Sequence, residues 1–294
     1  MGIGAGTQKS PAAFRRRVVA LALLASACAA PGPSYGVTGQ ADDDTAEIQA
    51  AIDRGGTVQL PAGVFRVSGL ELPPDVSLDG AGREATTIEV TGPVGITVTG
   101  RGFEGGTVKE IDTAGSISDI TIRGESGTAI LYHAAAYFDV RRCTISGFDI
   151  GIDQQGSLQS EVHDCKLVDN GTGLRYAAAR DTYYGPVLPP NRVLVSWSAF
   201  YANGTGIDYS GGQQLIVRDS EFGQNDAAIR VDASDGPGLV ASGLWMEGNP
   251  SPVIRVTGNA NHVLRDSFFA YTEGPIIEGS MVCENVTRLE GGGC

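Results

Sequence analysis

The sequence predicts an all-β solenoid of about ten stacked coils, because one short pattern recurs along most of the chain. The pattern is Val-x-x-[Cys/Ser]-x-[Leu/Phe], followed by a turn with Asn and then by Gly-[Ile/Leu]. Successive copies begin at Val140, Val162, Val195, Val217, Ala241 and Leu264. The intervals of 22, 33, 22, 24 and 23 residues indicate coils of about 22 residues, one of them with an insertion of about 11. Because such a coil buries its apolar face only against its neighbours, the repeat predicts a parallel β-helix.

A second observation is a column of asparagines in the turn of the repeat. Asn170, Asn203, Asn225 and Asn249 fall at the same position of four copies. An inward asparagine at such a turn can hydrogen-bond to the backbone of the next coil. Four asparagines in register therefore indicate a ladder that runs along the solenoid.

Composition agrees with an all-β fold that has many turns. The 294 residues are 41% hydrophobic and 19% charged and include 42 glycines, whereas a helical bundle would be richer in Ala, Leu, Glu and Lys. The formal net charge of -13 argues against nucleic acid as a partner, because phosphate binding needs a basic surface. An acidic glycan would need a local basic groove for the same reason.

The N-terminus has the features of a signal peptide. Residues 15–17 are arginines, and the apolar segment 18–24 is too short to span a bilayer. We therefore expect residues 1–28 to be a signal peptide and the protein to be exported.

Two processing events fit the end of this segment. Ala25-Ser26-Ala27 provides an Ala-x-Ala-like cleavage site, whereas Cys28 fits lipidation after cleavage in front of it. The segment resembles a bacterial lipobox with Ala25 in place of the commoner Leu. Secretion and lipid anchoring at the bacterial cell surface both stay open, with membrane contact only through Cys28. We expect residues 29–41 to be a flexible linker.

A short capping helix is expected at the start of the solenoid. Asp44 is placed as the N-cap with Glu47 three residues later, and Ile48, Ala51 and Ile52 share one face. Such a helix would cover the open end of the first coil.

The opening of the domain carries a family resemblance. Its runs Asp43-Asp44-Thr45, Gly55-Gly56-Thr57-Val58, Leu60-Pro61-Ala62-Gly63 and Gly80-Ala81-Gly82 resemble the start of pectate-lyase-like β-helix proteins. That superfamily includes polysaccharide lyases, glycoside hydrolases and phage tailspike depolymerases. The motif covers about residues 42–90, and the coil repeat extends the resemblance to about residue 285. It implies one right-handed parallel β-helix domain over 42–294 and a polysaccharide as partner, but it does not fix the reaction.

The resemblance also implies where a site would lie. It places the Asn turn between the second and third strands, so the insertion at 177–191 lies in the third turn beside the first-strand face, where family members bind glycan. Residue columns followed from coil to coil bring together Arg141, Arg142, His163, Asp164, Lys166 and Trp197, with Arg218 beyond them, Arg180, Tyr183 and Tyr184 in the insertion, and His133 in an earlier third turn.

These residue types fit β-elimination on a uronate. Arg141 and Arg142 would neutralise the sugar carboxylate, and Lys166, His163 or Tyr184 would remove the C5 proton. Aromatic side chains of the group would stack on sugar rings. A polysaccharide lyase on an acidic glycan is therefore the first interpretation, although a charged column on a β-helix is more often only a solvated surface.

Two other functions remain open. Asp164 and Asp219 share a column two coils apart, about 9–10 Å, which is near the spacing in inverting glycosidases. Because Asp recurs there, again at Asp266, these residues are more simply turn formers. The third interpretation is a non-catalytic surface or adhesion solenoid that binds glycan. The oligomeric state cannot be deduced from the sequence.

Cysteines and metals add little chemistry. Cys143 and Cys165 occupy one column, which suits either a disulfide or a buried thiol stack, and Cys283 can pair with Cys294. Calcium is the one cofactor considered, at residues 42–44, but helix capping explains these aspartates better. No zinc-ligand spacing is present.

Overall fold

The computed structural model describes residue 39 and residues 42–100, 115–182, 185–233, 236–291 and 294. These residues all belong to one compact unit, Gly32–Cys294.

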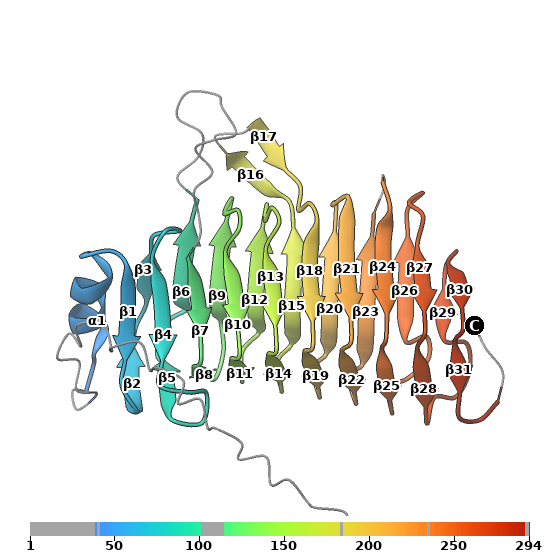
Figure 1. The fold of residues 1–294 in the computed structure, drawn as a ribbon, viewed down its shortest axis with the longest axis horizontal. Coiled ribbons are helices and arrows are strands. Elements are labelled where there is room, and N and C mark those ends of the chain that lie inside the picture. Colours follow the sequence, from blue (N-terminus) through green and yellow to red (C-terminus); the bar gives the residue numbers. More distant parts are fainter. Residues whose placement is uncertain (1–38, 40–41, 101–114, 183–184, 234–235, 292–293) are drawn as a thin grey trace, which may run out of the picture. The chain divides into compact units, whose positions relative to one another are not determined.

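The described strands form three long parallel sheets, named A, B and C here (Figure 1). Sheet A contains β1 (Thr57–Leu60), β4 (Ser77–Gly80), β7 (Ser116–Ser118), β10 (Asp139–Arg141), β13 (Glu161–His163), β18 (Val193–Ser196), β21 (Gln214–Arg218), β24 (Gly238–Ser242), β27 (Val263–Arg265) and β30 (Val282–Glu284). Sheet B contains β2 (Gly63–Val67), β5 (Thr86–Val90), β8 (Thr121–Arg123), β11 (Thr144–Ser146), β14 (Lys166–Val168), β19 (Ala199–Tyr201), β22 (Glu221–Gly223), β25 (Trp245–Glu247), β28 (Phe268–Ala270) and β31 (Thr287–Arg288). Sheet C contains β3 (Leu70–Leu72), β6 (Val94–Thr99), β9 (Thr128–His133), β12 (Ile150–Gln155), β15 (Thr172–Ala177), β20 (Thr205–Ser210), β23 (Ala227–Asp232), β26 (Ile254–Thr257) and β29 (Ile277–Glu278).

Among the described residues, the coils contribute one strand to each sheet in turn, except that the last contributes none to sheet C, and each strand pairs with its counterpart one coil away. Val140 of β10 lies beside Val162 of β13, and Val162 lies beside Val195 of β18. This register is the repeat read from the sequence. Sheets of ten, ten and nine strands confirm the predicted all-β solenoid of about ten coils.

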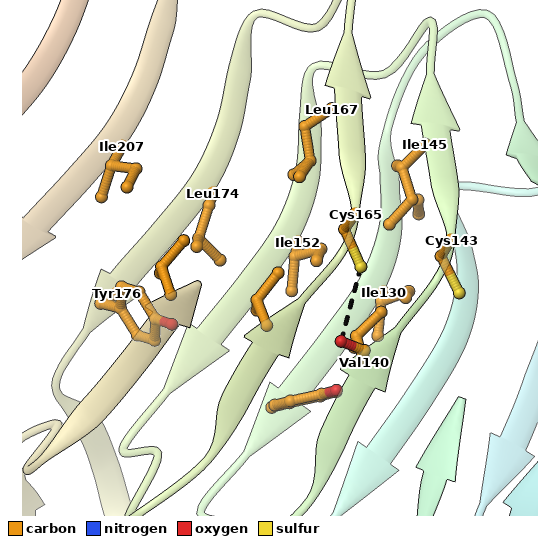
Figure 2. Packing of buried hydrophobic residues seen from close by; sticks show 14 of the residues in the cluster. Ile130, Val140, Cys143, Ile145, Ile152, Cys165, Leu167, Leu174, Tyr176 and Ile207 are labelled. Carbon is orange, nitrogen blue, oxygen red and sulfur yellow. Dashed lines mark hydrogen bonds between the residues drawn. The ribbon is translucent and has the colours of Figure 1, made fainter. Parts of the chain in front are cut away.

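Inward side chains of the three sheets fill the interior and stack from coil to coil (Figure 2). In sheet B, Ile145, Leu167, Phe200 and Phe222 follow one another in register, and all are fully buried. The rings of Phe200 and Phe222 stack with their centroids 4.8 Å apart. Because burial of such a side chain contributes roughly 1.5–3 kcal/mol, these columns stabilise the stack of coils.

The asparagine column forms the predicted ladder. Asn170, Asn203, Asn225 and Asn249 are buried in the turn between sheets B and C. The Nδ2 of each of the first three donates to the Oδ1 of the next, at 3.1, 2.9 and 3.0 Å. Each Oδ1 from Asn203 onward also accepts the backbone N–H of the preceding asparagine. The ladder therefore fixes both the turn and the spacing of the coils.

The capping helix is α1 (Thr45–Ile52), which buries Ile48, Ala51 and Ile52 as expected. The role predicted for Asp44 is wrong in one respect, since its side chain makes no capping bond to its own helix. Its buried carboxylate accepts the backbone N–H of Arg66 at 2.9 Å, and its own N–H donates to the Arg66 carbonyl. Asp44 thus ties the helix to β2.

The cysteines have structural positions. Cys283 and Cys294 form a disulfide, as the sequence suggested. Cys143 and Cys165 are free and buried, which decides between the two alternatives in favour of a thiol stack. The Cys165 thiol donates to the Val140 carbonyl at 3.4 Å (Figure 2).

Candidate functional site

The outward face of sheet A carries a polar column across four successive strands. Register places Arg141 beside His163, His163 beside Ser196, and Ser196 beside Arg218. The side chains of Arg141 and His163 are 42% and 37% exposed. Three residues that the sequence selected, the two arginines and the histidine, therefore share one accessible face.

A hydrogen-bond relay fixes the imidazole of His163. Its Nδ1 lies 2.8 Å from the Oγ of Ser196, and this hydroxyl donates to Oε1 of Glu161 at 2.9 Å. Because the hydroxyl has one proton and an ionised carboxylate only accepts, Ser196 accepts the Nδ1–H of His163. The neutral ring then carries its lone pair on Nε2, which has no hydrogen-bond partner among the described residues. The relay therefore fixes the orientation of the imidazole and leaves the lone pair of Nε2 available to accept a proton.

Two carboxylates on the same face were missed by the sequence analysis. Asp139 lies next to Glu161 across β10 and β13, and its Oδ1 accepts the Glu161 backbone N–H at 2.9 Å. One guanidinium N of Arg141 lies 2.6 Å from Asp139 and 3.7 Å from Glu161. Burial raises the pKa of Asp139, although Arg141 opposes the rise. Both carboxylates precede a selected residue by two positions, so strand alternation could have placed them on this face.

A cavity of about 400 Å³ adjoins these groups on sheet A. Its lining includes Asp139, Glu161, Leu194, Ile216, Arg192 and Arg218. The outward column that holds the two carboxylates continues as Leu194, Ile216, Val240 and Val263. The charged residues of this column therefore lie at β10 and β13. Arg192 and Arg218 in the cavity lining supply local positive charge on an acidic chain.

The next residue column lies in the turn between sheets A and B. Arg142, Asp164 and Trp197 adopt left-handed backbone angles there, with φ of 51°, 49° and 52°. Arg142 Nε donates to Asp119 at 2.8 Å, and Arg83 donates to both the carboxylate and the carbonyl of Asp164 at 2.8 Å.

Asp164 and Arg142 of the turn are therefore each paired with a side chain of opposite charge. The hydrogen bonds to aspartate raise the pKa values of Arg83 and Arg142. Asp219 and Asp266 also have positive φ, of 50° and 47°. The aspartates of this column thus have the turn-forming geometry expected of them.

The group selected from the sequence therefore divides in two. Arg141, His163 and Arg218 lie on sheet A, whereas Arg142, Asp164 and Trp197 lie at the corner between the sheets. Lys166 begins β14 on sheet B and lines a second cavity, of about 350 Å³, together with Asp164 and Trp197. The division arises because the one left-handed residue between the strands turns the chain and directs its side chain away from the sheet A face.

The insertion forms an antiparallel hairpin of β16 (Ala179–Thr182) and β17 (Gly185–Leu188) in the connection from sheet C to sheet A (Figure 1). Arg180 is exposed on it, opposite Val187. Tyr183 and Tyr184 lie outside the described residues.

His133 ends β9 on sheet C. Register places it beside Gln155, and Gln155 beside Ala177, where the insertion begins. It is therefore on the third-turn side, as the column indicated, and away from the His163 relay on sheet A.

Two further features, a metal-ligand cluster and a membrane-spanning helix, are absent from the described residues. No group of three or more His, Cys, Asp or Glu side chains there is arranged to hold a metal ion. No helix in the same part of the chain has the length and apolarity needed to cross a membrane.

Comparisons with known proteins give several similarities. Mannuronan C5-epimerase AlgE3 of Azotobacter vinelandii is 49% identical in an alignment of 70 residues that covers 19% of this chain and 4% of that protein. The alginate lyase of Paenibacillus sp. str. FPU-7 has a similar structure, with a TM-score of 0.55 and 15% identity over 81% of this chain and 96% of that one. The tailspike protein of Acinetobacter phage vB_ApiP_P1 gives a TM-score of 0.61 and 15% identity over 86% of this chain and 52% of that one.

These structural similarities, at low identity, concern the fold. The chain spans 4% of the curated relative and about half of the tailspike. The model of the family described as "Right handed beta helix region" matches residues 85–268, which is more than half of the chain. The solenoid of parallel sheets described above is the architecture that this model represents. The chain therefore belongs to the right-handed β-helix family.

Proposed function

We propose that the protein acts on an acidic polysaccharide, which it binds along sheet A and cleaves by β-elimination with His163 as the base. The observation that carries the proposal is the relay from Glu161 through Ser196 to His163, which leaves Nε2 free on an exposed face. A solvated surface residue does not need such orientation, whereas a general base does.

The arginines supply what a uronate requires. Removal of the C5 proton builds negative charge on the sugar carboxylate, so nearby cations lower the barrier. Arg218, two strands from His163, and Arg192 both line the cavity of about 400 Å³ on sheet A. Arg141 is already paired with Asp139. In the proposed step Nε2 takes the C5 proton, the C4–O4 bond breaks, and a C4–C5 double bond forms. The imidazolium then protonates the departing oxygen.

The comparisons support the class of substrate. The similar proteins include an alginate lyase, a mannuronan epimerase and a phage tailspike. They favour a polysaccharide as the partner, and the first two favour a uronate. We extend the proposal to export through a signal peptide over 1–28, followed by secretion or by anchoring through lipid on Cys28.

One observation favours a second function, a retaining glycoside hydrolase. Asp139 and Glu161 lie on neighbouring strands, about 5 Å apart, which is the carboxylate spacing of retaining enzymes. The raised pKa of Asp139 suits a general acid. In such a hydrolase, Asp139 and Glu161 would be the catalytic carboxylates in place of Asp164 and Asp219, because Asp164 is already paired with Arg83.

A substrate panel tests the proposal. Residues 37–294 are incubated with acidic and neutral polysaccharides, with calcium and with chelator, while ultraviolet absorbance of the unsaturated product and new reducing ends are recorded together. Absorbance that rises with reducing ends supports elimination. Reducing ends without absorbance would transfer the assignment to Asp139 and Glu161, and silence on the whole panel would favour a binding solenoid without catalysis.

A further inference from the structure

The corner between sheets A and B contains a cavity of about 350 Å³ that the proposed reaction does not use. Its lining includes Trp197, Trp245, Lys166, Asp219, Glu221 and Gly243. These residues come from the turn and from sheet B, whereas His163, Arg141 and Arg218 lie on the outward face of sheet A. The cavity is therefore a separate surface feature.

Two exposed tryptophans distinguish this cavity from an ordinary groove. Trp197 and Trp245 are 65% and 46% exposed. They belong to coils two steps apart, which places them about 10 Å apart along the solenoid. The Trp245 ring packs against Phe268, with centroids 4.6 Å apart, and its Nε1 donates to Glu247 at 3.3 Å. The ring is therefore held in place while much of it stays accessible.

The position of Trp197 has a conformational cost. Its φ is 52°, a left-handed angle that is uncommon for a bulky residue. The same turn position in other coils holds Asp119, Arg142, Asp164, Asp219 or Asn285, so a large apolar side chain is not needed for the turn. Strain of this kind is more often retained where a side chain serves a site.

Gly243 lines the cavity and leaves room for the side chain of Asp219. Its φ is 64°, but Asp219 and Asp266 adopt φ of 50° and 47° at the same turn position. The backbone therefore does not require glycine here. A Cβ on Gly243 would lie 2.6 Å from an Oδ1 of Asp219, so a side chain at this position would displace the Asp219 carboxylate from its place in the cavity lining.

The polar lining is rich in acceptors and acidic on balance. The lining contains the acidic residues Asp219 and Glu221 and one basic residue, Lys166, while a further acidic residue, Asp164, is paired with Arg83. The hydroxyl of Tyr201 donates to Glu221 at 2.9 Å, and burial together with this carboxylate raises the pKa of Tyr201 to about 12. Carboxylates held beside aromatic faces accept hydrogen bonds from sugar hydroxyls and repel a uronate.

We propose that this corner cavity is a second saccharide-binding site, which takes an uncharged pyranose unit against Trp197 and Trp245 and hydrogen-bonds its hydroxyl groups through Asp219 and Glu221. The site is independent of the elimination chemistry proposed for sheet A. A protein with both surfaces would hold a neutral segment of a glycan at the corner while sheet A engages acidic residues.

Intrinsic fluorescence tests the site directly, because the chain has only two tryptophans and both line the cavity. Residues 37–294 are titrated with cellohexaose, laminarihexaose, maltohexaose, mannohexaose and chitohexaose, and with oligogalacturonate as the charged comparison. We expect a saturable change in tryptophan emission with at least one neutral probe, with a Kd that an excess of oligogalacturonate leaves unchanged.

Matched variants separate binding from folding. Gly243→Asn, which places in the cavity a residue that Asn285 shows to be compatible with this turn, should raise the Kd of the responding probe at least tenfold with an unchanged circular dichroism spectrum. Tyr271→Ala, which removes an exposed aromatic with φ of 54° away from the cavity, should leave the Kd unchanged. No saturable response to any neutral probe, a Kd for the responding probe that rises with added oligogalacturonate, or an unchanged Kd in Gly243→Asn would overturn the proposal.

Discussion

Asn225→Ala should destabilise the solenoid more than any exposed substitution of the same type. The Asn225 side chain is fully buried and makes four hydrogen bonds of 2.9–3.1 Å: to the carbonyl of Phe200, to Oδ1 of Asn249, and from the backbone and side-chain N–H groups of Asn203. At about 1 kcal/mol for each buried bond, the expected loss of unfolding free energy is about 4 kcal/mol. The Asn203 backbone N–H would lose the acceptor that the ladder provides.

Urea denaturation followed by circular dichroism measures this loss, with Asn261→Ala as the matched control. Asn261 is exposed, so its replacement should change the unfolding free energy by less than about 0.5 kcal/mol. If Asn225→Ala cost no more than Asn261→Ala, the ladder would not contribute to stability as argued.

Three further predictions concern charge, pH and thiols. On a uronate substrate, Arg141→Ala should lower kcat/KM at least tenfold, because Asp139 and Glu161 would lose the cation that they share. Arg142→Ala should instead mainly lower the melting temperature. Equal losses of kcat/KM in the two variants would contradict this prediction. Burial lowers the pKa of His262, so the unfolded state binds a proton more readily than the folded state. The free energy of unfolding should therefore be highest above about pH 6.5 and should fall as the pH is lowered. In denaturation curves, His262→Gln should weaken this pH dependence. In residues 37–294 the two buried free thiols should react with a thiol reagent only after unfolding, and rapid reaction of the native protein would show that they are accessible.

The periodic features of the fold could be predicted because two numbers determine them. A coil of about 22 residues and the two-residue alternation of strands together set which side chains become neighbours. Asn170 and Asn203 are 33 residues apart and still bond, because the insertion lies between them in the third turn. The same arithmetic placed His163 beside Ser196.

The arrangement of the candidate site could be predicted only in part, for a reason of geometry. A column follows residues along the solenoid, but it does not show which neighbouring columns face the same way. Sequence adjacency joined Arg141 to Arg142, yet the left-handed residue at the turn separates them. Alternation would instead have joined His163 to Glu161, two residues earlier on the same face.

Contacts between distant coils had no signal in the repeat. Arg83 reaches Asp164 across 81 positions of sequence from the connection between β4 and β5, and it engages a carboxylate that the sequence had offered as catalytic. The Asp44 carboxylate likewise accepts the backbone N–H of Arg66 in the first coil and makes no side-chain hydrogen bond to its own helix. Such partners depend on the lengths of individual turns, which the periodic pattern does not contain.

The central claim is that His163, held by Ser196 and Glu161, is the base of a β-elimination on sheet A. The most direct measurement is the rate of unsaturated-product formation from a uronate polymer by the wild-type protein, His163→Gln and His133→Gln, the last as a matched replacement at the end of sheet C. We predict a loss of at least about 100-fold for His163→Gln, the lower range of general base catalysis, and a change of less than about threefold for His133→Gln. Full activity in His163→Gln would contradict the account and return Lys166 as the candidate base.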